Sequence, residues 1–211
     1  MPETRTFAFN QSKSKATNRG TRVVAAPGIG QFRLQAPDLQ GGVCAAYACH
    51  YLQGRLLDQR DLLNHLQRQD IFKTIDENES QALVIKGKRT NVKSLAPLAE
   101  LFELEGAVVS LPKVPLSPGL MNELVSLRAG EGLLFSFYVP SLKGAHACAA
   151  YHSRGMRGLG LVGTHLYLFD PNYGEFKGSA NELGALLHNS YKGAQLMQKL
   201  VVRRREKVAP A

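Results

Sequence analysis

The chain is 211 residues long, 44% of its residues are hydrophobic, and its formal net charge is +9. This size and apolar content suit one domain built around a single core. Its three cysteines, at positions 44, 49 and 148, exclude a disulfide framework; without CxxC or CxxH spacing we expect no metal site, no cofactor and a reducing compartment.

The positive charge is high for this length, and its largest clusters are Lys86–Arg89 and Arg203–Arg205. Such a charge suits nucleic acid, an anionic membrane surface or an acidic protein. No basic stripe is interleaved with aromatic residues, which argues against specific nucleic-acid binding. We therefore expect a solvated basic surface, with an anionic membrane as a possible partner, on a monomer.

The chain begins with a polar segment over residues 1–22, which we expect to be a flexible leader. It contains no apolar run of the length that a classical signal peptide needs, and no later stretch is long enough to span a membrane. A folded domain is expected over residues 23–205, with a short tail over 206–211.

The predicted elements change character near the middle of the chain. An irregular loop over 27–42 leads into the first helix. Apolar residues at helical spacing predict helices over 43–57, from about 61, over 92–105, over 121–128 and over 181–189. Alternating apolar runs bounded by Pro and Gly predict strands over 132–139, 145–152, 164–170 and 195–203. Helices first and strands second indicate an α+β fold in which the first helix packs on an antiparallel sheet.

The start of the first helix carries the most informative residue. Gly41, Gly42 and Val43 lead directly into Cys44, which is followed by Ala45 and other small helix formers. Unpaired backbone N–H groups and the helix dipole favour a thiolate at this position. The backbone N–H of Cys44 can also stabilise an oxyanion. The alternative is a buried structural cysteine, which is the role expected for the other two cysteines.

Strand parity brings a histidine and an aspartate together. His146 and His152 share one face of their strand, and Asp170 ends the next one. If the hairpin is symmetric about Gly158, His146 lies directly opposite Asp170. His152 remains the alternative partner, in a hairpin centred at Leu161.

Cysteine, histidine and aspartate together form the arrangement used for acyl transfer by a thiol. His146 would take the proton of Cys44 and return it to the leaving amine, while Asp170 would orient the imidazole. Taken singly, each residue has an ordinary structural explanation: a core histidine or an aspartate that starts a turn before proline. The conjunction of all three favours catalysis.

Three motifs, over residues 41–46, 144–147 and 169–176, resemble the YopT-type cysteine proteases, papain-like effectors that bacteria inject into host cells. The third motif, Phe-Asp-Pro-Asn-Tyr-Gly-Glu-Phe, is the most specific. The motifs cover roughly residues 40 to 180. Within the third motif, two roles remain open for Glu175: binding a basic residue or capping the loop. Asn172 and Tyr173 suit either substrate contact or a turn.

The resemblance implies a papain-like fold and a Cys44–His146–Asp170 triad without a cofactor. It also implies an amide side chain before the cysteine that completes the oxyanion hole; Gln40 and Gln35 are the candidates. The implied setting is the host cytosol, reached through a bacterial type III-like system, with a host protein as substrate.

Three functions follow from these expectations. The first is an endopeptidase that works through a thioester. The second keeps the triad but acts as an amidase, deamidase or transglutaminase. The third is a non-catalytic adaptor that uses its basic surface.

Overall fold

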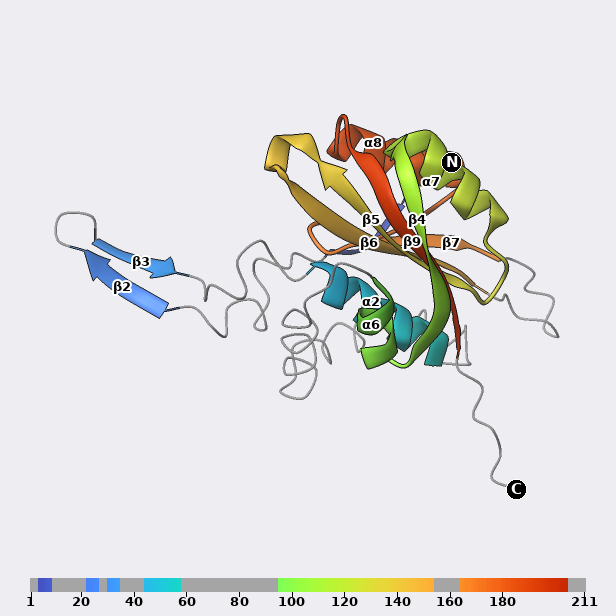
Figure 1. Cartoon of the computed structure of the whole chain (residues 1–211), viewed down its shortest axis with the longest axis horizontal. Coiled ribbons are helices and arrows are strands. Elements are labelled where there is room, and N and C mark those ends of the chain that lie inside the picture. The colour runs from blue at the N-terminus through green and yellow to red at the C-terminus, as the bar shows by residue number, and fades with distance from the viewer. Residues whose placement is uncertain are drawn as a thin grey trace, which may run out of the picture.

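The computed structural model describes residues 4–8, 22–26, 30–34, 44–57, 95–153 and 164–204. Its centre is a seven-stranded sheet in the order β1-β8-β7-β6-β5-β9-β4, in which every neighbouring pair is antiparallel (Figure 1). The strands are β1 Thr4–Ala8, β4 Leu104–Pro115, β5 Gly132–Val139, β6 Gly144–His152, β7 Leu166–Asp170, β8 Gly174–Gly178 and β9 Gln195–Arg204. Two further strands, β2 Arg22–Ala26 and β3 Gly30–Leu34, pair with each other in a separate sheet.

Helices cover both faces of the large sheet (Figure 1). On one face lie α2 Cys44–Leu57 and α6 Leu95–Leu101, and on the other lie α7 Leu116–Ser126 and α8 Ala180–Ser190. A 3-10 turn, η3 Pro140–Leu142, joins β5 to β6. Because side chains alternate along each strand, the two faces carry separate hydrophobic cores, one under α2 and α6 and one under α7 and α8. Among the described residues, no helix is both long and apolar enough to cross a membrane.

Helix α2 is held tightly against the sheet. Leu52 is fully buried in the core beneath it, a burial that typically contributes about 1.5–3 kcal/mol. Gly132 of β5 permits this approach, since a Cβ there would lie only 2.7 Å from Cδ2 of Leu52. The middle of α2 therefore packs closely against β5 at Gly132.

Most of the predicted elements are confirmed. The first helix, the strands at β5, β6, β7 and β9, and the helix at α8 match their expected positions to within two residues. The predicted helix over 121–128 is α7, which begins five residues earlier, at Leu116. The helix expected from about residue 61 lies outside the described residues.

Three expectations about the chain are wrong. The helix predicted over 92–105 ends at Leu101, where Glu103 takes a left-handed φ of 57° and β4 begins at Leu104. Part of the predicted irregular loop is strand β3. Residues 4–8 of the expected leader form β1, which pairs with β8.

The fold class is α+β with an antiparallel sheet, as predicted, but the order of helices before strands is wrong. Strand β4 lies between α6 and α7, and the N-terminal strand β1 forms one edge of the sheet. The sequence Gly-Glu-Phe-Lys-Gly of β8 holds a single large apolar residue, so no periodic signal marked it as a strand. Its pairing with β7 and β1 is decided by tertiary contacts.

Candidate active site

Cys44 is the first residue of α2, and its side chain is half-buried. At this position the backbone N–H groups of the first turn have no partner within the helix. The thiol of Cys44 hydrogen-bonds the imidazole of His146. The structure therefore brings the predicted nucleophile and the predicted base together.

His146 and Asp170 also meet. The distance from Nε2 of His146 to Oδ1 of Asp170 is 3.0 Å, and both side chains are buried. Because Nε2 is taken by the carboxylate, Nδ1 is the nitrogen left to serve a thiol. This is the relay of thiol, imidazole and carboxylate that acyl transfer requires.

The hairpin register differs from the predicted one by two residues. Ala149 pairs with Phe169 and His152 with Leu166, so paired positions sum to 318, where symmetry about Gly158 would give 316. If the ladder is continued by one residue in this register, Asp170 lies opposite Cys148. His146 is then the diagonal neighbour of Asp170. A shift of two keeps every side chain on the same face, because the side-chain period of a strand is two. The imidazole reaches the carboxylate along the diagonal.

The alternative histidine, His152, lies elsewhere. Its Nδ1–H donates to the backbone carbonyl of Leu127 at 2.7 Å, and its opposite residue in the ladder is Leu166. The alternative with the hairpin centred at Leu161 is therefore wrong, because that register would have placed His152 opposite Asp170.

Asp170 is held in one orientation by the turn at Asn172 and by Tyr191, a residue that the sequence did not point to. The hydroxyl of Tyr191 donates to Oδ2 at 2.8 Å, and the backbone N–H of Asn172 donates to Oδ1 at 2.8 Å. The side-chain amide of Asn172 donates in turn to the Tyr191 hydroxyl at 3.1 Å. Of the two roles left open for Asn172, the structure shows the turn.

Aromatic rings enclose the imidazole. The ring of Phe137 meets it edge-on at 5.4 Å between centroids, and that of Tyr191 lies tilted at 5.1 Å. Burial alone would lower the pKa of His146, but the hydrogen-bonded Asp170 carboxylate outweighs it and raises that pKa. The site therefore favours the imidazolium form.

A second thiol borders the same imidazole. Cys148 was expected to be a core residue, and it is fully buried, but its sulfur lies within 4.8 Å of ligand atoms of both His146 and Asp170. Burial raises the pKa of the Cys148 thiol. Cys148 is therefore protonated and out of reach of a polypeptide, whereas Cys44 is partly accessible. Cys49, on α2, is buried among apolar side chains, and burial likewise raises its pKa.

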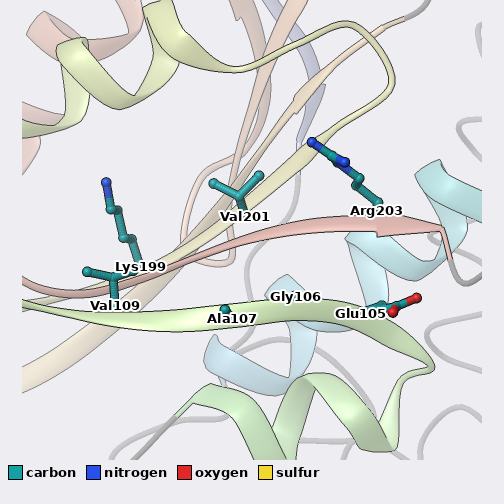
Figure 2. A pocket seen from close by; sticks show the side chains of 7 residues that line it. All are labelled: Glu105, Gly106, Ala107, Val109, Lys199, Val201 and Arg203. Atoms are coloured by element: carbon teal, nitrogen blue, oxygen red, sulfur yellow. The ribbon is translucent and has the colours of Figure 1, made fainter.

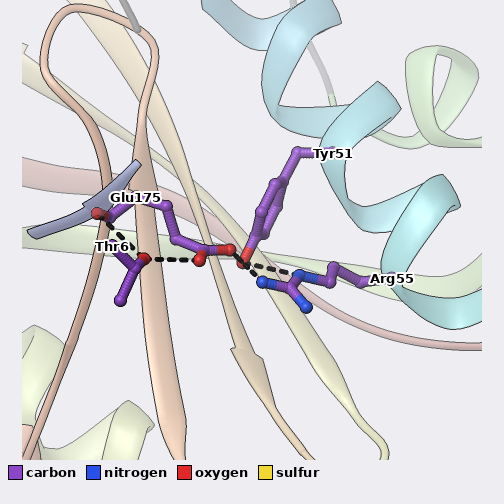
Figure 3. Close-up of polar contacts among 4 residues, drawn as sticks. All are labelled: Thr6, Tyr51, Arg55 and Glu175. Carbon is purple, nitrogen blue, oxygen red and sulfur yellow. Dashed lines mark hydrogen bonds and ion pairs between the residues drawn. The ribbon is translucent and has the colours of Figure 1, made fainter. Parts of the chain in front are cut away.

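Two turns along α2 from Cys44 lies a second buried polar cluster (Figure 3). Glu175 of β8 forms an ion pair with Arg55, and its carboxylate accepts hydrogen bonds from Tyr51 at 2.8 Å and from Thr6 at 2.6 Å. Of the two roles left open for Glu175, the structure shows the one in which it binds a basic residue.

The guanidinium of Arg55 is also enclosed by aromatic rings. Its central carbon lies 4.8 Å from the ring centroid of Tyr167, 5.4 Å from that of Tyr51 and 5.8 Å from that of Tyr151. Cation–π contact and the ion pair together offset the cost of burying both charges. The cluster fastens α2 to β8, and through Thr6 it joins β1.

The oxyanion-hole candidates Gln40 and Gln35 lie outside the described residues. The described donor closest to Cys44 in the chain is its own backbone N–H at the start of α2, which suits a developing negative charge.

An open groove lies on β4 and β9 (Figure 2), lined by Glu105, Gly106, Ala107, Val109, Lys199, Val201 and Arg203. No residue of the triad lines it. Its cations are engaged: Lys199 pairs with Glu123, and Arg203 pairs with Glu131. This part of the surface is therefore less basic than the net charge suggests.

No protein-family model and no curated protein sequence matches the chain. Among the solved structures that are similar to it are two bacterial proteins. The Pseudomonas avirulence protein AvrPphB is 18% identical, with a TM-score of 0.41 over 79% of this chain and 94% of that one. PatoxP, a cysteine protease-like domain of the Photorhabdus asymbiotica toxin PaTox, is 12% identical, with a TM-score of 0.40 over 87% of this chain and 55% of that one.

Proposed function

We propose that this protein is a papain-like cysteine endopeptidase of YopT type, delivered by a bacterium into a host cell, where it cleaves a host protein. The observation that carries the proposal is the contact chain from Cys44 to His146 to Asp170, with 3.0 Å between the last two side chains. The three motifs that supply these residues are the ones that resemble the family.

The chemistry follows from the positions of these side chains. Cys44, as the thiolate, attacks the scissile carbonyl carbon, and the oxyanion forms near the N-terminus of α2. His146 gives its proton to the leaving amine, so the C–N bond breaks and a thioester remains on Cys44. A water molecule, deprotonated by His146, then releases the acid and restores the thiol. Asp170 keeps the imidazole oriented and stabilises its charged form through both acyl transfers.

Covalent labelling tests whether the protein is a thiol enzyme or a non-catalytic adaptor. An active-site-directed epoxide should alkylate Cys44 in the wild type and should leave the Cys44→Ala variant unlabelled. Cys49→Ala is the matched control, because it removes another thiol of the same helix and should keep full labelling. A wild type that is folded but not labelled would favour the basic adaptor.

The substrate class is tested by capture. Cys44→Ala, expressed in a eukaryotic cell, should retain an intact host protein whose new N-terminus appears when the active enzyme is expressed. Mass spectrometry of both samples identifies the bond. Release of ammonia without new N-termini, or capture of bacterial cell-wall fragments, would instead support the amidase, deamidase or transglutaminase reading.

A further inference from the structure

Strand β1 reaches the turn that follows Asp170. In the sheet, Ala8 of β1 pairs with Gly174 of β8, and Gly174 pairs in turn with Asp170 of β7. Neighbouring strands lie roughly 4.8 Å apart, so the backbone of β1 passes about 10 Å from that of Asp170. The mechanism proposed above gives this strand no part in the chemistry.

The turn between β7 and β8 is held by contacts from within and from outside. Within it, the backbone N–H of Asn172 donates to Oδ1 of Asp170, and the backbone N–H of Tyr173 donates to the Asp170 carbonyl at 3.0 Å. From outside, the guanidinium of Arg5, 168 positions away in the chain, donates to the carbonyl oxygen of Tyr173. One residue of β1 thus contacts the turn that orients the catalytic carboxylate.

Gly174 explains why the outside contact matters. Its φ is 110°, a backbone conformation that residues with a side chain rarely adopt. Because glycine moves among several conformations at low cost, residue 174 does not by itself fix the orientation of the peptide group that joins it to Tyr173. The hydrogen bond from Arg5 selects one orientation, and a charged donor makes such a bond roughly twice as strong as a neutral one.

We propose that Arg5 is a positioning residue for the acyl transfer: it holds the turn over 171–173 in the conformation that directs the Asp170 carboxylate toward His146. Arg5 contacts no reacting atom and acts through the carbonyl of Tyr173. Its effect on the reactivity of Cys44 rests on the proposed function, whereas its effect on the imidazole does not. Residues 4–8, expected to be part of a flexible leader, are on this account part of the working domain.

The next residue of the same strand provides a matched control. Thr6 donates to the carboxylate of Glu175 at 2.6 Å and to the Glu175 carbonyl at 3.2 Å (Figure 3). It therefore contacts the buried cluster around Glu175 and Arg55 rather than the turn. Thr6→Val removes the hydroxyl and keeps the branched shape that suits a strand.

The first test measures the rate of epoxide labelling of Cys44 against pH in the full chain. Arg5→Ala should be labelled roughly 10-fold more slowly, which is the low end for a hydrogen bond to a charged group, because Arg5 is exposed. Its alkaline limb should move to lower pH, since a carboxylate that is held less well stabilises the imidazolium of His146 less.

The direction of that movement separates positioning from a simple charge effect. Loss of a nearby positive charge would favour the imidazolium and move the alkaline limb to higher pH. The titratable groups that face the imidazole are unchanged by Arg5→Ala; they are Cys44, Cys148, Asp170 and Tyr191. An alkaline limb that stays in place or moves to higher pH would overturn the proposal.

Two further variants make the labelling test specific. Arg5→Lys keeps a cationic donor and should restore most of the rate and the position of the alkaline limb. Thr6→Val should be labelled at the wild-type rate, but it should unfold at a lower denaturant concentration. Equal slowing in Arg5→Ala and Thr6→Val would show that β1 acts only through the stability of the sheet, and would also overturn the proposal.

A titration of the His146 ring separates this inference from the proposed function. The ¹⁵N chemical shifts of the ring nitrogens report its protonation in the full chain and require no reaction at Cys44. The ring should lose its proton at lower pH in Arg5→Ala than in the wild type, and Arg5→Lys should resemble the wild type. Identical titrations of wild type and Arg5→Ala would refute the positioning role. A shifted titration in a protein that no epoxide labels would refute the proposed function and leave that role standing.

Discussion

Two buried carboxylates of one motif, Asp170 and Glu175, have opposite roles in this protein. Asp170 faces the imidazole of His146, a group that can take up and release a proton. Glu175 faces the guanidinium of Arg55, which stays protonated at any working pH. The first pair can therefore take part in proton transfer, while the second can only hold elements together. The partner of each carboxylate, rather than its burial, decides whether the pair can take part in proton transfer or only stabilises the fold.

The two clusters also use the same helix. Cys44 begins α2 at the end that contacts His146, and Arg55 lies in its last turn, paired with Glu175. The ion pair and its aromatic surroundings fix the far end of the helix, and the core around Leu52 fixes its middle. The thiol at the near end consequently has a fixed position relative to His146, which is what a preorganised nucleophile requires.

The largest effect is expected at the proposed catalytic residues. His146→Ala should remove as much activity as Cys44→Ala, up to about 10⁶-fold, because the two residues act as a unit, and the double variant should lose no more. Stability should change little in comparison. Rates of cleavage of the host protein that Cys44→Ala captures provide the measurement for the three variants. Additive losses would show that the two side chains act separately.

Asp170→Asn should also reduce activity, but less than His146→Ala does. The expected loss is no more than about 10⁴-fold, which is the effect of the equivalent change in a serine triad. The carboxylate raises the pKa of His146, so its loss should lower that pKa and move the alkaline limb of the labelling profile to lower pH. The same raised pKa makes protonated His146 a source of stability below its unfolded pKa of about 6.5, lost as pH rises through the folded value. An alkaline limb that does not move would contradict this assignment.

Changes in the Glu175–Arg55 cluster should lower the stability of the fold rather than the reactivity of Cys44. Glu175→Gln or Arg55→Met leaves one buried charge unpaired and should cost about 3–5 kcal/mol of unfolding free energy. The double variant, with both charges removed, should recover much of that loss. Denaturant unfolding measures the free energies, and active-site titration counts the reactive molecules. A variant that stays fully stable yet cannot be labelled would show that this cluster affects the reactivity of Cys44 directly. It would contradict the assignment of Glu175 and Arg55 to stability alone.

The smallest effect is expected for Tyr191→Phe, which keeps the ring beside His146 and removes one hydrogen bond to Asp170. A hydrogen bond to a charged group is worth about 1.5–3 kcal/mol, which corresponds to roughly a 10- to 150-fold slower labelling rate if it acts fully on the catalytic step. Tyr173→Phe is the matched control, because its ring is exposed. Equal rates for wild type and Tyr191→Phe would show that Asn172 and His146 orient the carboxylate without it.

The sequence by itself predicted the elements that carry the site. Gly-Gly-Val before Cys44 marks a helix start. Because side chains alternate along a strand, His146 and Asp170 lie on one face of the sheet even if the register of the hairpin shifts by two residues. These patterns depend only on residues that are close in the sequence, so they can be interpreted without the rest of the structure. The catalytic roles of these residues remain a proposal that the labelling experiments test.

Only the tertiary structure decided the rest. The two-residue shift in register, the approach of Tyr191 to Asp170 and the place of Cys148 beside His146 depend on how strands pair and helices dock. Arg55 and Glu175 lie 120 positions apart in the chain, and Thr6 reaches the same carboxylate from a segment with no periodic pattern. Such contacts arise because each buried charge must find a partner within the folded chain, and that choice is made in three dimensions.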